Sequence, residues 1–122
     1  MNYILATTAC KPNRARSDMY LSVRICQDGN CCSTGTLDSR WNDFENCETN
    51  VFERKHLGSC YGFKMKDRLF VLTIQVSDFR GDRNGWMPTL IEIATRDGRR
   101  FLCPNGDMRA IDHSSFDFLC NQ

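Results

Sequence analysis

Long hydrophobic runs, repeats, low-complexity tracts and linkers are all missing from this sequence. A membrane-spanning helix needs about 20 consecutive apolar residues, so we predict no transmembrane segment. An excess of one charge is missing as well, because 16 Lys and Arg stand against 15 Asp and Glu, for a formal net charge of +1. No global field therefore favours nucleic acid or an anionic membrane as a partner. We interpret two local basic clusters, in residues 11–16 and 96–100, as solvated loops.

The spacing typical of zinc ligands is absent too. A structural zinc site needs cysteine pairs about two to four residues apart, or one such pair joined by two nearby histidines. The two histidines, His56 and His113, lie far apart, and the only close cysteines are the adjacent Cys31 and Cys32. Adjacent side chains point apart in an extended chain, so the sequence argues against a zinc site.

Cysteine is nevertheless abundant, and its even count predicts four disulfides in a secreted, extracellular domain. The first six residues lack the basic start and the apolar run of a secretory signal, so we expect a mature secreted domain. Our expected pairing joins Cys10 or Cys26 to Cys120 or Cys103, while the other four cysteines cross-link the irregular middle of the chain. The eight cysteines are Cys10, Cys26, Cys31, Cys32, Cys47, Cys60, Cys103 and Cys120.

Apolar residues alternate with polar ones, which is typical of half-buried β-strands. The clearest strands are predicted in residues 19–25, 69–76 and 90–95. Weaker candidates are residues 3–8, 34–37, 62–65, 99–103 and 116–120. Asp97-Gly98 is a strong hairpin signal. The chain is thus predicted to be all-β, with residues 1–122 forming a single antiparallel β-sandwich domain of about eight strands.

Several short motifs follow one another in a characteristic order. They are Tyr3-Ile4-Leu5-Ala6-Thr7, Ser17-Asp18 before Tyr20-Leu21-Ser22-Val23, Phe52-Glu53-Arg54, Leu57-Gly58, Asp78 after a long strand, Asn84-Gly85-Trp86 and Phe101-Leu102-Cys103. In this order the chain resembles the PLAT (lipoxygenase-homology) β-sandwich over about residues 3–112. The resemblance implies a non-enzymatic module that binds lipid surfaces or partner proteins, often through calcium.

Calcium requires about six to eight oxygen ligands, several of them carboxylates on loops. By the resemblance, Asp18 and Asp78 are candidate calcium ligands, and Asp82 and Asn84 add oxygens from the neighbouring loop. The alternative is that Asp78, Asp82 and Asn84 simply form turns beside glycines.

Two tryptophans are candidate binding residues. Trp86 either dips into a membrane interface or fills one end of the core, and we favour the core. Trp41 lies in a polar segment without periodicity, where Arg40, Trp41 and Phe44 are candidates for a protein-binding hot spot. Ordinary packing of these residues is the alternative.

An enzyme is not expected. With all cysteines bridged there is no free thiolate, and no nucleophile-elbow motif is present. Secreted pancreatic-type ribonucleases share the length and the cysteine count, and the segments around Lys11, His56 and His113 resemble theirs. However, the lysine precedes the first histidine here, whereas in that family it follows. We treat the ribonuclease as a remote alternative.

The sequence therefore predicts a secreted binding module that engages a lipid surface or an extracellular protein through loops at one end of the sandwich. The alternative is a toxin, defence or signalling protein that uses the sandwich as a scaffold for receptor binding. Four cysteines fall between Cys31 and Cys60, so disulfides are expected to fix the irregular stretch that contains Trp41. Oligomeric state is left open.

Overall fold

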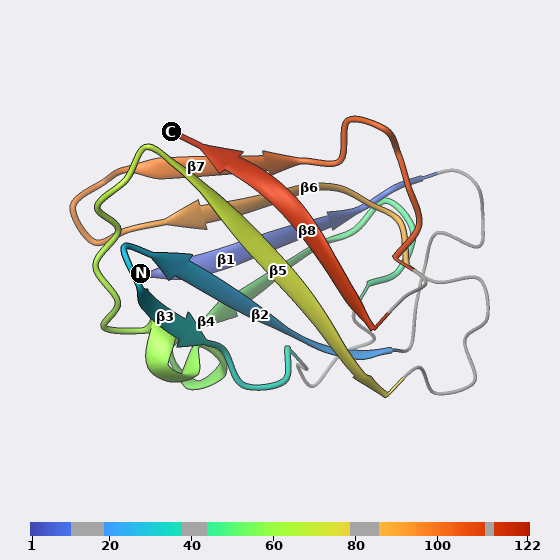
Figure 1. Cartoon of the computed structure of the whole chain (residues 1–122). Helices are drawn as coiled ribbons and strands as arrows, with labels where there is room; N and C mark the ends of the chain where they lie inside the picture. The colour runs from blue at the N-terminus through green and yellow to red at the C-terminus, as the bar shows by residue number, and fades with distance from the viewer. Residues whose placement is uncertain (11–18, 38–43, 79–85, 112–113) are drawn as a thin grey trace.

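The computed structural model describes residues 1–10, 19–37, 44–78, 86–111 and 114–122, and these contain eight antiparallel strands (Figure 1). The strands are β1 (Tyr3–Thr8), β2 (Tyr20–Gln27), β3 (Asn30–Ser33), β4 (Thr49–Glu53), β5 (Leu69–Asp78), β6 (Pro88–Ala94), β7 (Arg100–Pro104) and β8 (Ser115–Asn121). Two short 3-10 helices, η2 (Arg54–His56) and η3 (Gly58–Cys60), follow β4. Within the described ranges, no helix has the length and hydropathy needed to cross a bilayer.

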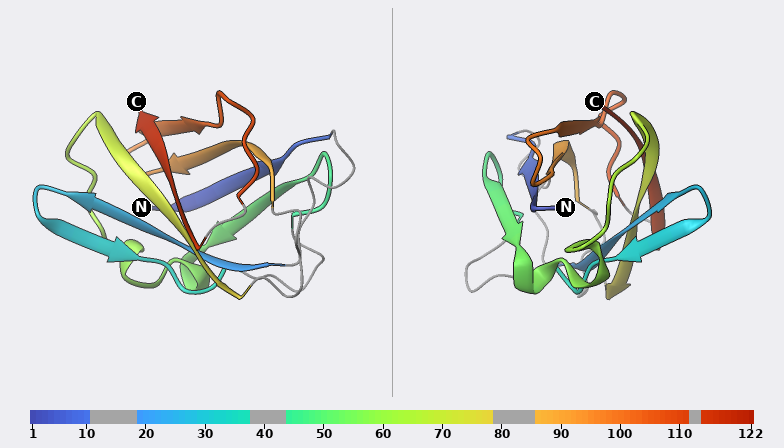
Figure 2. Two further views of the ribbon diagram at one scale, coloured as in Figure 1. Left: turned by 45° about the vertical axis from the view of Figure 1, so that its right-hand side comes forward. Right: turned by 90° about the vertical axis from the view of Figure 1, so that its left-hand side faces the viewer.

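The strands form two layers, which the end-on view of Figure 2 separates clearly. Their hydrogen-bonded order is β3-β2-β5-β8-β7-β6-β1-β4. The first four strands make one layer and the last four the other, joined where Leu102 of β7 pairs with Asn121 of β8. The expected antiparallel β-sandwich is confirmed.

Alternating side chains from both layers fill the space between them. In β2 the residues at every second position are buried, as the period of two requires. The same pattern holds in β5 and β8 on one layer and in β7 on the other, and β6 follows it from Leu90 to Ile93. The buried side chains include Ile4, Leu21, Val23, Ile25, Phe52, Leu72, Ile74, Ile91, Ile93, Phe101 and Phe118.

Two of the weaker strand predictions are wrong. Residues 34–37 form no strand, because the chain turns back earlier, at Asp28-Gly29, and β3 begins at Asn30. Both turn residues have positive φ, +50° and +78°, which is the backbone of a tight two-residue hairpin. Residues 62–65 also form no strand and instead cross one end of the sandwich.

The expectation of four disulfides is confirmed, but the expected bond between an early and a late cysteine is wrong. The bonds are Cys10–Cys47, Cys26–Cys31, Cys32–Cys60 and Cys103–Cys120. Cys26 and Cys31 face each other across the β2–β3 hairpin, so the nearest thiol is local. The two late cysteines lie on the neighbouring strands β7 and β8 and bond to each other rather than to the early strands.

The turn from η2 to η3 fixes where the following segment begins. Gly58 has a φ of +54°, and a Cβ there would lie 2.6 Å from the carbonyl oxygen of Ser33. The Ser59 hydroxyl accepts from the Ser33 amide at 2.9 Å, and Cys60 is bonded to Cys32. The 3-10 turns are therefore held on the edge of β3, and residues 61–68 start from a fixed point.

Candidate functional site

Trp86 belongs to the core, which is the placement that we favoured from the sequence. Its side chain is 1 % exposed, and its Nε1 donates a hydrogen bond to the Thr8 hydroxyl at 2.8 Å. Its ring centroid lies 4.6 Å from that of Phe44, and its backbone pairs with Ile111. In this structure the indole is therefore not available to dip into a membrane, and Trp86 is corrected from a binding residue to a packing residue.

The expectation that Phe44 contributes to an exposed hot spot is wrong. Phe44 is 2 % exposed and contacts Phe52 as well as Trp86. Its φ is +62°, and its amide donates to the Asn50 side-chain oxygen at 2.9 Å. Phe44 reaches the core from an irregular stretch of backbone. It therefore belongs to no alternating pattern in the sequence that would indicate its burial. Arg40 and Trp41 lie outside the described residues.

The predicted calcium ligands are mostly outside the described residues, which exclude Asp18, Asp82 and Asn84. Asp78 is exposed at the end of β5, opposite Tyr20 in the register. Among the described residues no three His, Cys, Asp or Glu side chains come together as a metal site. Calcium binding at this end of the sandwich stays a prediction.

The opposite end of the sandwich carries a concentration of positive charge. Residues 54–68 and 96–100 contain 8 of the 16 cations of the chain but only two of its 15 acidic residues, Asp67 and Asp97. This region, called the basic end below, includes η2, the segment before β5 and the β6–β7 turn. Its cations are Arg54, Lys55, Lys64, Lys66, Arg68, Arg96, Arg99 and Arg100.

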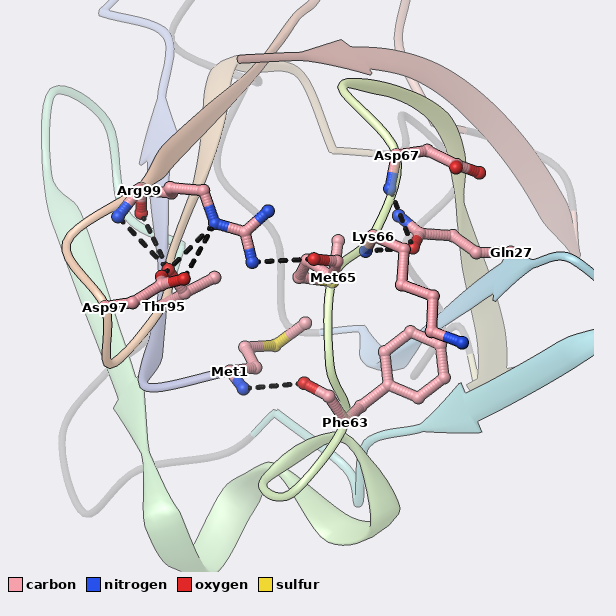
Figure 3. Close-up of polar contacts among 9 residues, drawn as sticks. All are labelled: Met1, Gln27, Phe63, Met65, Lys66, Asp67, Thr95, Asp97 and Arg99. Atoms are coloured by element: carbon pink, nitrogen blue, oxygen red, sulfur yellow. Dashed lines mark hydrogen bonds and ion pairs between the residues drawn. The ribbon is translucent and has the colours of Figure 1, made fainter.

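A cavity of about 470 Å³, called the basic pocket, opens at this end. Residues 61–66 line one side, and the β6–β7 turn lines the other through Thr95, Arg96, Asp97 and Arg99. Met1 and Met65 contribute buried apolar surface, and Phe63 is partly buried against the core. Figure 3 shows Met1 between this segment and the turn, and Met65 on the segment itself.

Hydrogen bonds from three distant parts of the chain hold the irregular segment in place (Figure 3). The Met1 nitrogen, just before β1, donates to the Phe63 carbonyl at 2.9 Å. Arg99, between β6 and β7, donates through Nη2 to the Met65 carbonyl at 2.6 Å. Gln27 of β2 accepts from the Lys66 amide at 2.8 Å. A segment without strand pairing is thus ordered by side-chain contacts, so its lysines project from a defined backbone.

Tyr61 contacts two guanidinium groups, of which that of Arg96 lines this pocket. The Arg96 guanidinium carbon lies 4.7 Å from the Tyr61 ring centroid, and the Arg54 carbon lies 5.6 Å from it. Arg96 also donates a hydrogen bond to the Tyr61 hydroxyl. Cation–π contacts of this kind position arginines without neutralising them. Among the described residues, no ion pair engages Arg54 or Arg96.

Asp97 is the carboxylate of the basic pocket, and its charge is already engaged. A hydrogen bond from Thr95, and after it one from Arg99, lowers the pKa of Asp97 below its ordinary value. The Arg99 Nε lies 3.0 Å from the carboxylate. Burial, and then the charge of Arg96, lowers the pKa of the Met1 amino group. The positive charges of Lys64, Lys66 and Arg96 are left for a ligand.

Exposed apolar side chains lie beside the basic end on the outer face of the sandwich. Val71 of β5 and Leu119 of β8 are cross-strand partners, and Leu69 and Leu102 both pair with Asn121. These four side chains, called the apolar strip, are between 44 % and 56 % exposed.

The composition of one segment indicates this site, although no periodic pattern does. Residues 54–68 contain five cations interspersed with two aromatic residues, Tyr61 and Phe63, and a single carboxylate, Asp67. Of the two basic runs at this end, we identify only residues 96–100 from the sequence, and we interpret them as a solvated loop. The fold brings the two runs together across the basic pocket.

Comparison with known proteins finds no matching family model, and no curated protein matches the sequence. Among solved structures, the chain is similar to coral 8R-lipoxygenase, whose structure is described in terms of calcium activation through a C2-like domain. The TM-score is 0.71 at 16 % identity, over 98 % of this chain. The chain corresponds to 17 % of the length of the lipoxygenase chain. The likeness shows the fold of a C2-like β-sandwich.

Proposed function

We propose that this protein is a non-enzymatic, extracellular module that binds anionic lipid surfaces through its basic end. The observation that carries the proposal is that half of the chain's cations lie at one end of the sandwich, where the basic pocket opens. Each Lys or Arg close to an anionic membrane contributes about 1 kcal/mol of attraction. Several such side chains on one end would therefore support binding in spite of a net charge of only +1.

The apolar strip favours a lipid surface over a soluble polyanion. Leu69, Val71, Leu102 and Leu119 are exposed on strands that border the basic end. Apolar side chains next to cations are typical of proteins that lie at the membrane interface, where they contact the acyl region beneath the headgroups. A nucleic acid or a sulfated polysaccharide would contact the cations and leave this strip in water.

The four disulfides fit an extracellular environment, where such bonds persist. Calcium is not needed for contact at the basic end, because the cations meet the headgroups directly. The predicted calcium ligand Asp78 lies at the other end of the sandwich. Binding through the basic end is therefore expected to persist in a chelator.

Cosedimentation with phosphatidylcholine vesicles, with and without phosphatidylserine, tests the proposal. Binding is expected only with phosphatidylserine, equally in EDTA and in calcium, and it should weaken markedly from about 0.1 M to about 0.5 M NaCl because salt screens the cations. Binding that requires calcium and ignores salt would place the contact at the Asp78 end instead. An absence of binding in every condition would favour the receptor-binding scaffold.

A further inference from the structure

We propose that the basic pocket binds one anionic amphiphile, with its phosphate or carboxylate head at Arg96 and Lys64 and its first carbons against Met1 and Met65. This inference rests on the proposed function and adds a defined ligand site to a general surface attraction. It applies equally to a lipid held in a bilayer and to a single amphiphile in solution, since both present the same head and the same adjoining carbons.

The size and the wall of the pocket support a ligand with an apolar part. A volume of about 470 Å³ falls within the usual range of small-molecule sites, about 300–1,000 Å³. Met1 and Met65 line the pocket with side chains that are only 5 % and 3 % exposed, but their thioethers are flexible and can adapt to hydrocarbon. The partly buried Tyr61 adds aromatic surface beside them. Inorganic phosphate alone would leave this part of the pocket unfilled.

The charges at the mouth support an anionic head. Arg96 lines the pocket, and Tyr61 positions its guanidinium group through a cation–π contact and a hydrogen bond. Guanidinium groups bind phosphate or carboxylate through two parallel hydrogen bonds. Lys64 lines the same pocket and is exposed. Asp97 does not compete for these cations, because Thr95 and Arg99 already bind its carboxylate.

The site is held open by contacts that the ligand does not need to make. Arg99 is tied to Asp97 and to the Met65 carbonyl, and the Met1 nitrogen is tied to the carbonyls of Tyr61 and Phe63. A pocket ordered before binding loses less conformational freedom when a ligand enters.

Isothermal titration with dihexanoyl phosphatidic acid, kept below its micelle-forming concentration, tests the inference. One molecule is expected to bind per chain, about tenfold or more tightly than inorganic phosphate, because burial of a few methylene groups strengthens binding by at least that factor. Dihexanoyl phosphatidylcholine, which has the same tails without the net charge, should also bind about tenfold more weakly. Amide shifts in an NMR titration should concentrate in residues 61–66 and 95–99.

A blocking substitution locates the site. Gly62 lines the pocket, and a Cβ there would meet no heavy atom within 4 Å, so Gly62→Trp is expected to fold normally and to fill the mouth. The matched control is Gly106→Trp, where a Cβ is equally unobstructed but the residue lies after β7 at the other end of the sandwich. Short-chain phosphatidic acid should bind Gly62→Trp at least about tenfold more weakly and Gly106→Trp unchanged.

The possible results separate this inference from the proposed function. Vesicle binding without one-to-one binding of the short-chain lipid overturns the pocket and leaves the surface attraction standing. Loss of both vesicle binding and short-chain lipid binding overturns both the pocket and the proposed function. Inorganic phosphate as tight as the short-chain lipid would show a simple anion site and overturn the amphiphile. Unchanged binding by a folded Gly62→Trp would place the ligand elsewhere and also overturn the inference.

Discussion

Trp86→Ala is expected to destabilise the fold by about 3–5 kcal/mol, the usual cost of truncating a buried aromatic side chain to alanine. The side chain is 1 % exposed, packs against Phe44 at a tilted angle and donates the hydrogen bond that satisfies the buried Thr8 hydroxyl. Its removal leaves a cavity at one end of the core and an unpartnered polar group. A domain of this size has a free energy of unfolding of about 5–15 kcal/mol, so the substitution would remove a large part of it.

Urea unfolding followed by circular dichroism measures this effect, and vesicle cosedimentation without urea measures binding on the same samples. Trp86→Phe is the matched control, because it keeps a ring against Phe44 and removes the bond to Thr8; it should cost about 1–2 kcal/mol. The fraction of Trp86→Ala that remains folded should bind anionic vesicles like the wild type. If Trp86→Ala is fully stable but no longer binds vesicles, the indole contacts the membrane and the packing role is contradicted.

Most of the sandwich was predictable because β-strands that face a core on one side leave an alternating pattern in the sequence. Residues 69–76 and 90–95 show it, and the structure has β5 and β6 there. The pattern says which face of a strand is buried but not which strand is its neighbour. That limit explains the wrong disulfide pairing: Cys103 and Cys120 are adjacent only because β7 and β8 lie next to each other.

Irregular segments were less predictable because tertiary contacts determine them. Phe44 reaches the core from a backbone with positive φ, and residues 62–65 are ordered by bonds to Met1 and Arg99 from distant parts of the chain. Neither kind of contact has a local sequence period.

The candidate site was missed for a different reason, because net charge averages over the whole chain. The formal net charge is +1 whether the basic and acidic residues are evenly mixed or concentrated in different regions of the surface. In the sequence, β5 and β6 lie between residues 54–68 and residues 96–100. The two runs meet only when the β6–β7 turn packs beside the segment before β5.

Reversing two charges of the basic end should nearly abolish binding to anionic vesicles. Lys64→Glu combined with Arg96→Glu removes two cations from the rim of the basic pocket and adds two carboxylates in their place. At about 1 kcal/mol for each charge, the change is about 4 kcal/mol, or roughly a thousandfold in affinity. Both side chains are exposed and outside the core, so thermal unfolding should be almost unchanged.

The matched control for this variant is Arg24→Glu combined with Arg109→Glu, which changes the net charge by the same amount. Arg24 lies within β2, and the Arg109 guanidinium covers the Phe116 ring, 4.6 Å from its centroid. Neither lines the basic pocket. If the position of the charge matters, the control should lose less than about tenfold, the part that comes from the weaker attraction of the whole molecule. Equal losses in the two variants would mean that vesicles respond to net charge alone, and a basic end with a specific role would then be rejected.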